Sequence, residues 1–317
     1  MLRRLLAITA LIGLAACGGS APQPAASASA EPVTLTVGVL PVVDVAPLYL
    51  GVQKGFFKEQ GLTLNIKLAQ GGAAIVPAVI SGDYQFGFSH TVSLILATGK
   101  GLKLKVISQG VQDGSDPNSD AWAILTTNPA ITQCKDLEGK TTAVNTLKNI
   151  GEVSIKAACD KGGVDVSKFK LIEMGFPDML PALQKNQIDA MWTAEPFVTQ
   201  AKQGGAKVLL YNMVATEPHL SVATYFASAD YAAKNPGIVK RFVTAVGKSL
   251  DYGTAHPSEI RGIVNSYAKI ADPVLQAMVL PYWSHDLNKP SIDKLNTLMV
   301  KYGLQTQKAD LKDFYYS

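Results

Sequence analysis

The chain has 317 residues, of which 47% are hydrophobic, so it is long enough for two domains and needs no disulfide scaffold to fold. Its 29 lysine and arginine residues against 25 aspartate and glutamate residues give a formal charge of +4. That charge supplies no basic stripe of the kind that nucleic-acid binding needs. Composition and charge therefore argue against nucleic acid as a partner.

The first 16 residues have the pattern of a secretory signal peptide. Arg3 and Arg4 precede an apolar stretch, Leu5 to Leu14, which is shorter than the roughly 20 residues of a membrane span. Cys17 follows Leu14-Ala15-Ala16, which resembles the bacterial lipobox, in which the cysteine is lipidated; the alternative is an ordinary signal peptide with an incidental cysteine. Residues 17–32 are then predicted to be a lipidated cysteine and a flexible tether. We expect an exported protein, anchored at the outer face of the cytoplasmic membrane or in the periplasm.

The remaining cysteines, Cys134 and Cys159, are expected to form a disulfide in an oxidising compartment; the alternative is two separate buried thiols. The four histidines are scattered and there is no Cys-x-x-Cys, so we expect no metal site and no cofactor.

Residues 34–108 alternate between strands and helices. Strands are predicted at 34–40, 63–69, 84–88 and 104–108, with Leu35, Val37 and Val39 on one face of the first. Pro77 fits the second helix if that helix starts near Ala74 and the proline lies in its first turn. Such alternation is typical of a parallel sheet with helices on both faces.

After a polar stretch at 112–120, the same pattern returns. Strands are predicted at 121–127, 140–145, 169–174, 188–193 and 207–211, with helices at 149–160, 179–185 and 196–203. A strand at 222–228 is followed by helical periodicity alone, and these helices are expected to complete the first domain. The predicted fold class is α/β with two doubly wound sheets, domain 1 comprising 33–113 and 222–317 and domain 2 comprising 114–221.

Ligands of parallel sheets bind at the carboxyl ends of the strands, where helix N-termini present unpaired N–H groups. The corresponding loops here are 41–46, 70–73, 89–91, 145–149, 175–178 and 193–195. Within them, Asp178 and Glu195 could act as a carboxylate pair, although acids at helix starts are commonly caps. His90 could donate to a ligand, or it could be solvated or locally bonded. Phe176 and the neighbouring Trp192 could line a site or pack in a core.

Familiar catalytic patterns are missing from the sequence, which has no Gly-x-Ser-x-Gly, His-Glu-x-x-His or Gly-x-Gly-x-x-Gly. Their absence is modest support for a protein that is not an enzyme.

The stretches PLYLGVQKGFFKEQGLTLNI (47–66) and GGAAIVPAVISGDYQFGF (71–88) resemble the solute-binding proteins of nitrate/sulfonate/taurine ABC importers, a family that includes binders of thiamine-pyrimidine precursors. Residues 137–141, 195–197 and 231–242 look like later landmarks of the same family. The resemblance implies a type II periplasmic-binding-protein-like fold, with hinge crossovers near 110–122 and 218–225. It also implies a monomer that serves a permease and its ATPase. The family's ligand loops fall on Asp44, Gln70, Gly71, Gly72, Ser89, His90, Thr91, Asn145, Thr146, Asn149, Phe176, Asp178, Trp192 and Glu195.

The function expected from these features is capture of a small organic anion, a sulfonate or an aromatic carboxylate, for an ABC importer. Helix N-termini, amides and hydroxyls would hold the anion, because the candidate loops contain one fixed cation, Lys148. If Asp44, Asp178 and Glu195 face the ligand, a neutral or cationic pyrimidine stacked on Trp192 becomes the better candidate. An extracytoplasmic sensor is a further alternative. A pyrimidine-synthase-like enzyme is the weakest, since that resemblance calls for a cysteine-rich iron site and a cytosolic protein.

Overall fold

The computed structural model describes residues 31–316, which belong to one compact unit. Cys17 and the predicted signal peptide lie outside the described residues. Between residues 31 and 316, no helix combines the length and the apolar character needed to cross a membrane.

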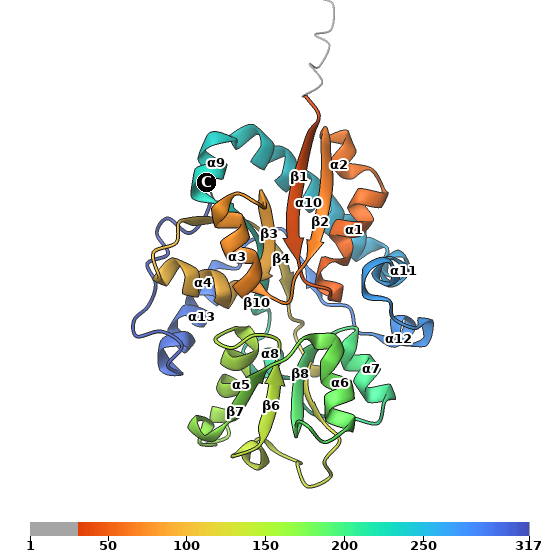
Figure 1. Ribbon diagram of the computed structural model, residues 1–317, viewed down its shortest axis with the longest axis vertical. Coiled ribbons are helices and arrows are strands. Elements are labelled where there is room, and N and C mark those ends of the chain that lie inside the picture. The colour runs from red at the N-terminus through yellow and green to blue at the C-terminus, as the bar shows by residue number, and fades with distance from the viewer. Residues whose placement is uncertain (1–30, 317) are drawn as a thin grey trace, which may run out of the picture. The chain divides into compact units, whose positions relative to one another are not determined.

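Two mixed sheets form the framework (Figure 1). The six-stranded sheet has the order β11 (Tyr282–Trp283), β4 (Leu104–Gln112), β10 (Ser221–Ser228), β3 (Phe86–His90), β1 (Val33–Val39) and β2 (Leu62–Leu68). The five-stranded sheet has the order β7 (Lys170–Glu173), β6 (Thr141–Val144), β8 (Ala190–Ala194), β5 (Trp122–Thr126) and β9 (Lys207–Leu210). We call each sheet with its helices a lobe: the first lobe contains the six-stranded sheet, and the second lobe contains the five-stranded sheet.

Helices accompany both sheets. In chain order they are α1 (Ala46–Gln53), α2 (Phe56–Glu59), α3 (Gly72–Ser81), α4 (Thr91–Gly99), α5 (Ile150–Asp160), α6 (Phe176–Gln184), α7 (Phe197–Gln203), α8 (Asn212–Thr216), α9 (Ala229–Lys234), α10 (Pro236–Ala255), α11 (Pro257–Ala268), α12 (Asp272–Ala277) and α13 (Lys289–Lys301). Short 3-10 turns are η1 (Val43–Val45), η2 (Pro117–Ser119), η3 (Cys134–Leu137) and η4 (Val166–Lys168). In β3, Phe86 stacks on Phe242 of α10 at 4.0 Å, whereas Gly87 faces Ile75 of α3. The two faces of the first sheet are therefore covered by different helices, as the alternation predicts.

The prediction of parallel sheets is wrong at two interior strands, β10 and β5. β1 runs parallel to β2 and β3, and β6 runs parallel to β7 and β8, but β10 is antiparallel to β3 and β4, and β5 is antiparallel to β8 and β9. Both exceptions follow a chain segment that crosses over from the other lobe. The parallel strands of each sheet end at the edge that faces the other lobe. A strand that enters the sheet from the other lobe starts at this edge, so it runs antiparallel to them. The crossovers therefore account for the mixed sheets.

Several element boundaries also differ from the sequence prediction. β3 begins at Phe86 rather than 84 and extends to His90, so Ser89 and His90 belong to the strand and not to a loop. Helix α6 begins at Phe176 rather than 179, because Pro177 is compatible with the first helical turn. Helix α3 begins at Gly72, so Pro77 lies in its interior; the carbonyl that loses its partner belongs to Ala73, an exposed residue that water can reach. The short strand β11 was not predicted.

Cys134 of η3 and Cys159 of α5 are joined by a disulfide, with their Cα atoms 5.5 Å apart. The alternative of two separate thiols is not what the structure shows. The bond ties the long loop after β5 to the helix that follows β6.

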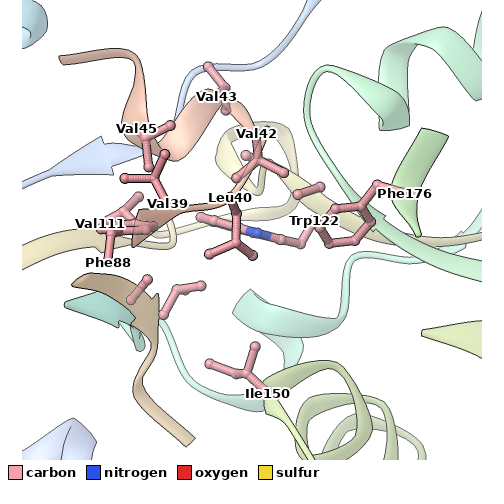
Figure 2. Close-up of a cluster of buried hydrophobic side chains, with 14 of the residues drawn as sticks. Val39, Leu40, Val42, Val43, Val45, Phe88, Val111, Trp122, Ile150 and Phe176 are labelled. Carbon is pink, nitrogen blue, oxygen red and sulfur yellow. The ribbon is translucent and has the colours of Figure 1, made fainter. Parts of the chain in front are cut away.

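One apolar cluster connects the two lobes (Figure 2). Leu40 and Val42, which follow β1, belong to the same cluster as Trp122 of β5 and Phe176 of α6. All four side chains are buried, with exposed fractions of 3% or less. The lobes therefore meet across a packed interface, next to the polar groups described below.

Candidate functional site

Direct hydrogen bonds link the lobes at the ends of their strands. The Gln70 side-chain Nε2 donates to the Asn145 carbonyl (2.8 Å), and Asn145 Nδ2 donates back to the Gln70 carbonyl (3.1 Å). In addition, the Val43 N–H donates to the Glu195 carbonyl at 3.0 Å. We call the reciprocal Gln70–Asn145 pair the amide clasp. It holds the segment after β2 against the segment after β6.

Two surface pockets lie beside the amide clasp. One, of about 220 Å³, is lined by Gln70 together with Pro41 and Phe176; the other, of about 230 Å³, is lined by Gly72, Thr146 and Lys148 among others. Residues of both lobes line each pocket, so the boundary between the lobes is open to solvent beside the clasp. Lys148, the cation singled out in the sequence, is exposed at this rim.

Asn149 and His90 meet behind the clasp. Asn149 caps α5, and its Nδ2 lies 2.9 Å from His90 Nδ1, at the end of β3. His90 is fully buried, and burial lowers its pKa to about 4 because the charged ring would be desolvated. Its second ring nitrogen, Nε2, is buried with no hydrogen-bond partner among the described residues. The ring is therefore neutral at neutral pH and has one polar atom free to meet a ligand.

Trp192 lies next to this histidine. The centroids of the two rings are 6.1 Å apart in an edge-on arrangement, and the Phe176 ring centroid lies 6.0 Å from that of Trp192. The indole is fully buried, and its Nε1–H has no partner among residues 31–316. A Cβ on Gly151 would lie 2.5 Å from the indole, so a glycine is required at this point of α5.

Asp44 lies in η1, directly after β1, and is also fully buried. Both carboxylate oxygens lack a hydrogen-bond partner within the described chain, and desolvation raises the pKa of this group to about 7. The turn is fixed from the C-terminal part of the chain: Trp283 Nε1 donates to the Asp44 carbonyl (3.0 Å), and the Tyr267 hydroxyl donates to the Val42 carbonyl (2.9 Å). The carboxylate is thus held in place without a partner of its own.

Tyr225 of β10 adds a further buried polar group. Burial raises the pKa of its hydroxyl, with the nearby Asp44 charge as a second cause, and the hydroxyl has no partner in the described part of the chain. We call Asp44, His90, Asn145, Trp192 and Tyr225 the interior site; each is fully buried and has a side-chain polar atom with no hydrogen-bond partner among residues 31–316. They come from both lobes.

The structure does not bring every predicted residue into this site. Both oxygens of Glu195 are already used: Oε2 accepts from the Thr199 N–H (2.9 Å), and Oε1 from the Thr199 hydroxyl (2.7 Å) and the Val279 N–H (3.1 Å). Asp178 is exposed in the first turn of α6. Glu195 is therefore bonded to the first turn of α7, next to the N-cap residue Pro196, and neither acid belongs to the interior site.

The remaining predicted residues have supporting contacts. Thr91 Oγ1 lies 3.3 Å from the Ser221 hydroxyl, and the Ser89 hydroxyl donates to the His90 carbonyl at 3.3 Å. A Cβ on Gly72 would lie 2.4 Å from Ser89 Oγ, and one on Gly71 would lie 2.9 Å from Thr146 Cγ2. These glycines let the start of α3 approach both β3 and the second lobe.

Tyr225 and Trp122 were missed by the sequence reasoning. Trp122 is fully buried in β5, and its Nε1–H also lacks a partner among residues 31–316. Both residues lie in the strands that follow the crossovers, whereas the sequence prediction rests on the loops at strand ends. An aromatic side chain with a polar atom next to each crossover was the available signal.

Comparisons with known proteins are consistent with this arrangement. A taurine-binding periplasmic protein of Escherichia coli is 27% identical over 187 residues, covering 59% of this chain and 56% of that protein. A 4-amino-5-hydroxymethyl-2-methylpyrimidine phosphate synthase of Saccharomyces cerevisiae, THI11, is 22% identical over 242 residues, covering 72% of this chain and 69% of the enzyme. The chain thus spans little more than half of the taurine-binding relative.

Among solved structures, the alkanesulfonate-binding protein SsuA from Xanthomonas axonopodis pv. citri superimposes with a TM-score of 0.76 at 15% identity, covering 91% of this chain and all of that one. At this identity the match establishes the fold, which is that of the two-lobed periplasmic binding proteins, as predicted. Residues 42–260 match the family described as NMT1/THI5 like. Since this match covers more than half of the sequence, the chain belongs to the NMT1/THI5-like family.

Proposed function

We propose that this protein is the solute-binding component of an ABC importer and that it holds a small organic solute in the interior site, between its lobes. The observation that supports this most strongly is the set of buried polar atoms that have no hydrogen-bond partner within the described chain. A buried polar group without a hydrogen bond costs about 1–3 kcal/mol, so a fold that holds several together at one interface gains stability when a ligand satisfies them. The taurine-binding and alkanesulfonate-binding proteins named above support the same class of function.

The polar atoms of the interior site fall into two kinds. His90 Nε2 and Trp192 Nε1 can donate hydrogen bonds, which suits the oxygens of a sulfonate or a carboxylate. Asp44 can accept hydrogen bonds and can carry a negative charge. Among the described residues, no lysine or arginine is buried, so no buried cation offsets two negative charges in the interior site. We therefore infer an organic acid that also carries an amine, with the acid group at the N–H donors and the amine at Asp44.

A pyrimidine is the second candidate, and Asp44 is the observation that favours it. A protonated or amino-substituted ring could pair with this carboxylate and stack against Trp192. An enzyme of the synthase type is less well supported. That activity is expected to need a cysteine-rich iron site, whereas Cys134 and Cys159 are committed to a disulfide.

Export and anchoring are part of the same proposal. We expect Cys17 to carry lipid, a permease and its ATPase to be the partners, and the protein to act as a monomer; a sensor that signals to a receptor would use the same site. Mass analysis of the mature N-terminus tests the anchor. An unmodified first residue other than Cys17 would contradict it.

A thermal-shift screen tests the ligand class. The panel includes ethanesulfonate against taurine, which differ by an amine, together with benzoate, nitrate and 4-aminopyrimidine. We expect the compound with both an acid and an amine to raise the melting temperature more than its partner without the amine. The variant Asp44→Asn should abolish this difference, and Asp313→Asn, which changes an exposed carboxylate, should retain it. Stabilisation by 4-aminopyrimidine alone would overturn the acid assignment in favour of the pyrimidine.

A further inference from the structure

We propose that Asn149 is a positioning residue that fixes the tautomer of His90, so that this histidine offers the solute a permanent N–H donor at Nε2. The solute must then place a hydrogen-bond acceptor at that point. The statement about the solute rests on the proposed function, whereas the statement about the tautomer does not.

The orientation of the Asn149 amide is determined by its neighbours. Its Oδ1 accepts from the Ile150 N–H (2.7 Å) and from the Ser93 hydroxyl (3.1 Å). Its Nδ2 donates to the Thr146 hydroxyl (2.8 Å) and faces His90 Nδ1 at 2.9 Å. If oxygen and nitrogen were exchanged, an NH₂ group would face the backbone N–H of Ile150, which can only donate. The amide therefore presents a hydrogen, and not a lone pair, to His90.

This orientation determines where the imidazole carries its proton. A donor at Asn149 Nδ2 requires a bare, accepting Nδ1 on His90, so the proton of the neutral ring is on Nε2. An imidazolium would place an N–H against the Asn149 NH₂, so the same contact opposes protonation. Desolvation acts in the same direction by lowering the pKa of His90. The ring is held in one of its three possible forms.

The contact crosses between the lobes, since His90 ends β3 and Asn149 begins α5. Next to it, Trp192 Nε1 is a second N–H donor that cannot accept, with its ring 6.1 Å from His90. Two neighbouring donors that cannot change to acceptors make this side of the site selective. An acceptor oxygen can satisfy either of them, whereas an amine at the same place would leave two donors facing each other.

The tautomer can be measured directly in the full chain labelled with ¹⁵N-histidine. Long-range ¹⁵N–¹H correlation spectra identify which ring nitrogen carries hydrogen, and His90→Gln assigns the His90 signals. At neutral pH we expect His90 to show a protonated Nε2 and a bare Nδ1. His256 is an internal reference, because its Nδ1 lies 2.8 Å from the Tyr252 carbonyl and must carry the hydrogen whenever the ring is neutral. A His90 spectrum with hydrogen on Nδ1, or on both nitrogens, would overturn the proposal.

The variant Asn149→Asp tests the cause. A carboxylate still accepts from Ile150 and Ser93, but it presents an acceptor to His90, so the His90 pattern should change to one with hydrogen on Nδ1. The variant Thr146→Val is the control, because the Ile150 bond still orients the amide, and it should leave the pattern unchanged. An unchanged His90 pattern in folded Asn149→Asp would show that Asn149 does not set the tautomer. If that variant does not fold, the wild-type spectrum still decides the proposal.

The ligand half is tested by titrating taurine and benzoate into the labelled protein. We expect a compound that raises the melting temperature to move the Nε2 resonance without changing the tautomer. Thermal stabilisation with no movement of that resonance would show that the solute does not contact His90. No stabilisation by any compound would count against the proposed ligand class and leave the tautomer result standing.

Discussion

Replacing Asp44 with asparagine should stabilise the folded protein while weakening its binding of an amine-bearing solute. Asp44 is fully buried, and neither carboxylate oxygen has a partner in the described part of the chain. Such a group costs stability whenever it is ionised, because its charge has left water without compensation. Asparagine has nearly the same shape and cannot ionise, so it removes this cost.

The magnitude follows from the pKa of Asp44, which burial raises from 3.8 to about 7. Each pKa unit is worth about 1.4 kcal/mol, so the ionised carboxylate costs the folded state about 4 kcal/mol at and above pH 7. Because the folded-state pKa is raised, the folded protein holds more protons than the unfolded chain between these values. Its stability therefore falls as pH rises from 3.8 to about 7 and is then constant with respect to this group.

Urea unfolding of the wild type and of Asp44→Asn across this pH range is the assay. The stability gained by the variant should be smallest near pH 4 and should grow by up to about 4 kcal/mol as the pH passes 7. The amide that Asp44→Asn introduces would also be buried, but its cost does not change with pH. The test is therefore how the stability difference between variant and wild type changes with pH. A difference that is the same at acid and neutral pH would show that ionisation of Asp44 does not destabilise the fold, and the ligand would then need no amine.

Three further outcomes are expected. Asn145→Ala removes one of the two hydrogen bonds of the amide clasp, the bond from Asn145 Nδ2 to the Gln70 carbonyl, which is worth about 1 kcal/mol. Solute affinity measured by titration calorimetry should therefore fall about fivefold. Unchanged affinity would mean that the clasp does not support binding. At the crossovers, burial and then the Asp120 charge raise the pKa of Asp113 to about 8, so its carboxylate destabilises the fold as pH rises to that value. Asp113→Asn, which retains an acceptor for the Leu220 N–H, should stabilise the protein more at pH 9 than at pH 6 in urea unfolding, and equal gains at both would refute this. Finally, Cys159→Ser removes the disulfide between residues 25 apart in sequence and should lower the free energy of unfolding by about 3 kcal/mol. Two free thiols in the denatured, unreduced wild type would contradict the disulfide.

Much of the fold could be predicted because hydrophobic periodicity is local. Leu35, Val37 and Val39 alternate along β1 and are fully buried, and the pattern of strands followed by helices predicts two α/β sheets. The direction of β5 and β10 could not be predicted in this way. It depends on the chain passing from one lobe to the other, and periodicity within a strand carries no information about that.

The place of the candidate site in the fold could be predicted from the sequence, but the role of each residue in it could not. The rule that ligands bind at strand ends led to Asp44, His90 and Asn149, which the structure places in or beside the interior site. It also led to Asp178 and Glu195, because an acidic residue after a strand has the same sequence pattern whether it faces a ligand or bonds to the start of a helix. Only the positions of Thr199 and Val279 show that Glu195 is already fully bonded. The lone Asp44 carboxylate is likewise a property of packing, which depends on Trp283 and Tyr267 far along the chain.

The central claim is that the solute binds between the lobes and holds them together. Small-angle scattering of the mature protein, with and without a saturating concentration of the compound that gives the largest thermal shift, tests it most directly. We predict that the radius of gyration falls when that compound is added and that Asn145→Ala needs a higher concentration for the same fall. An unchanged radius at saturation would contradict capture between closing lobes.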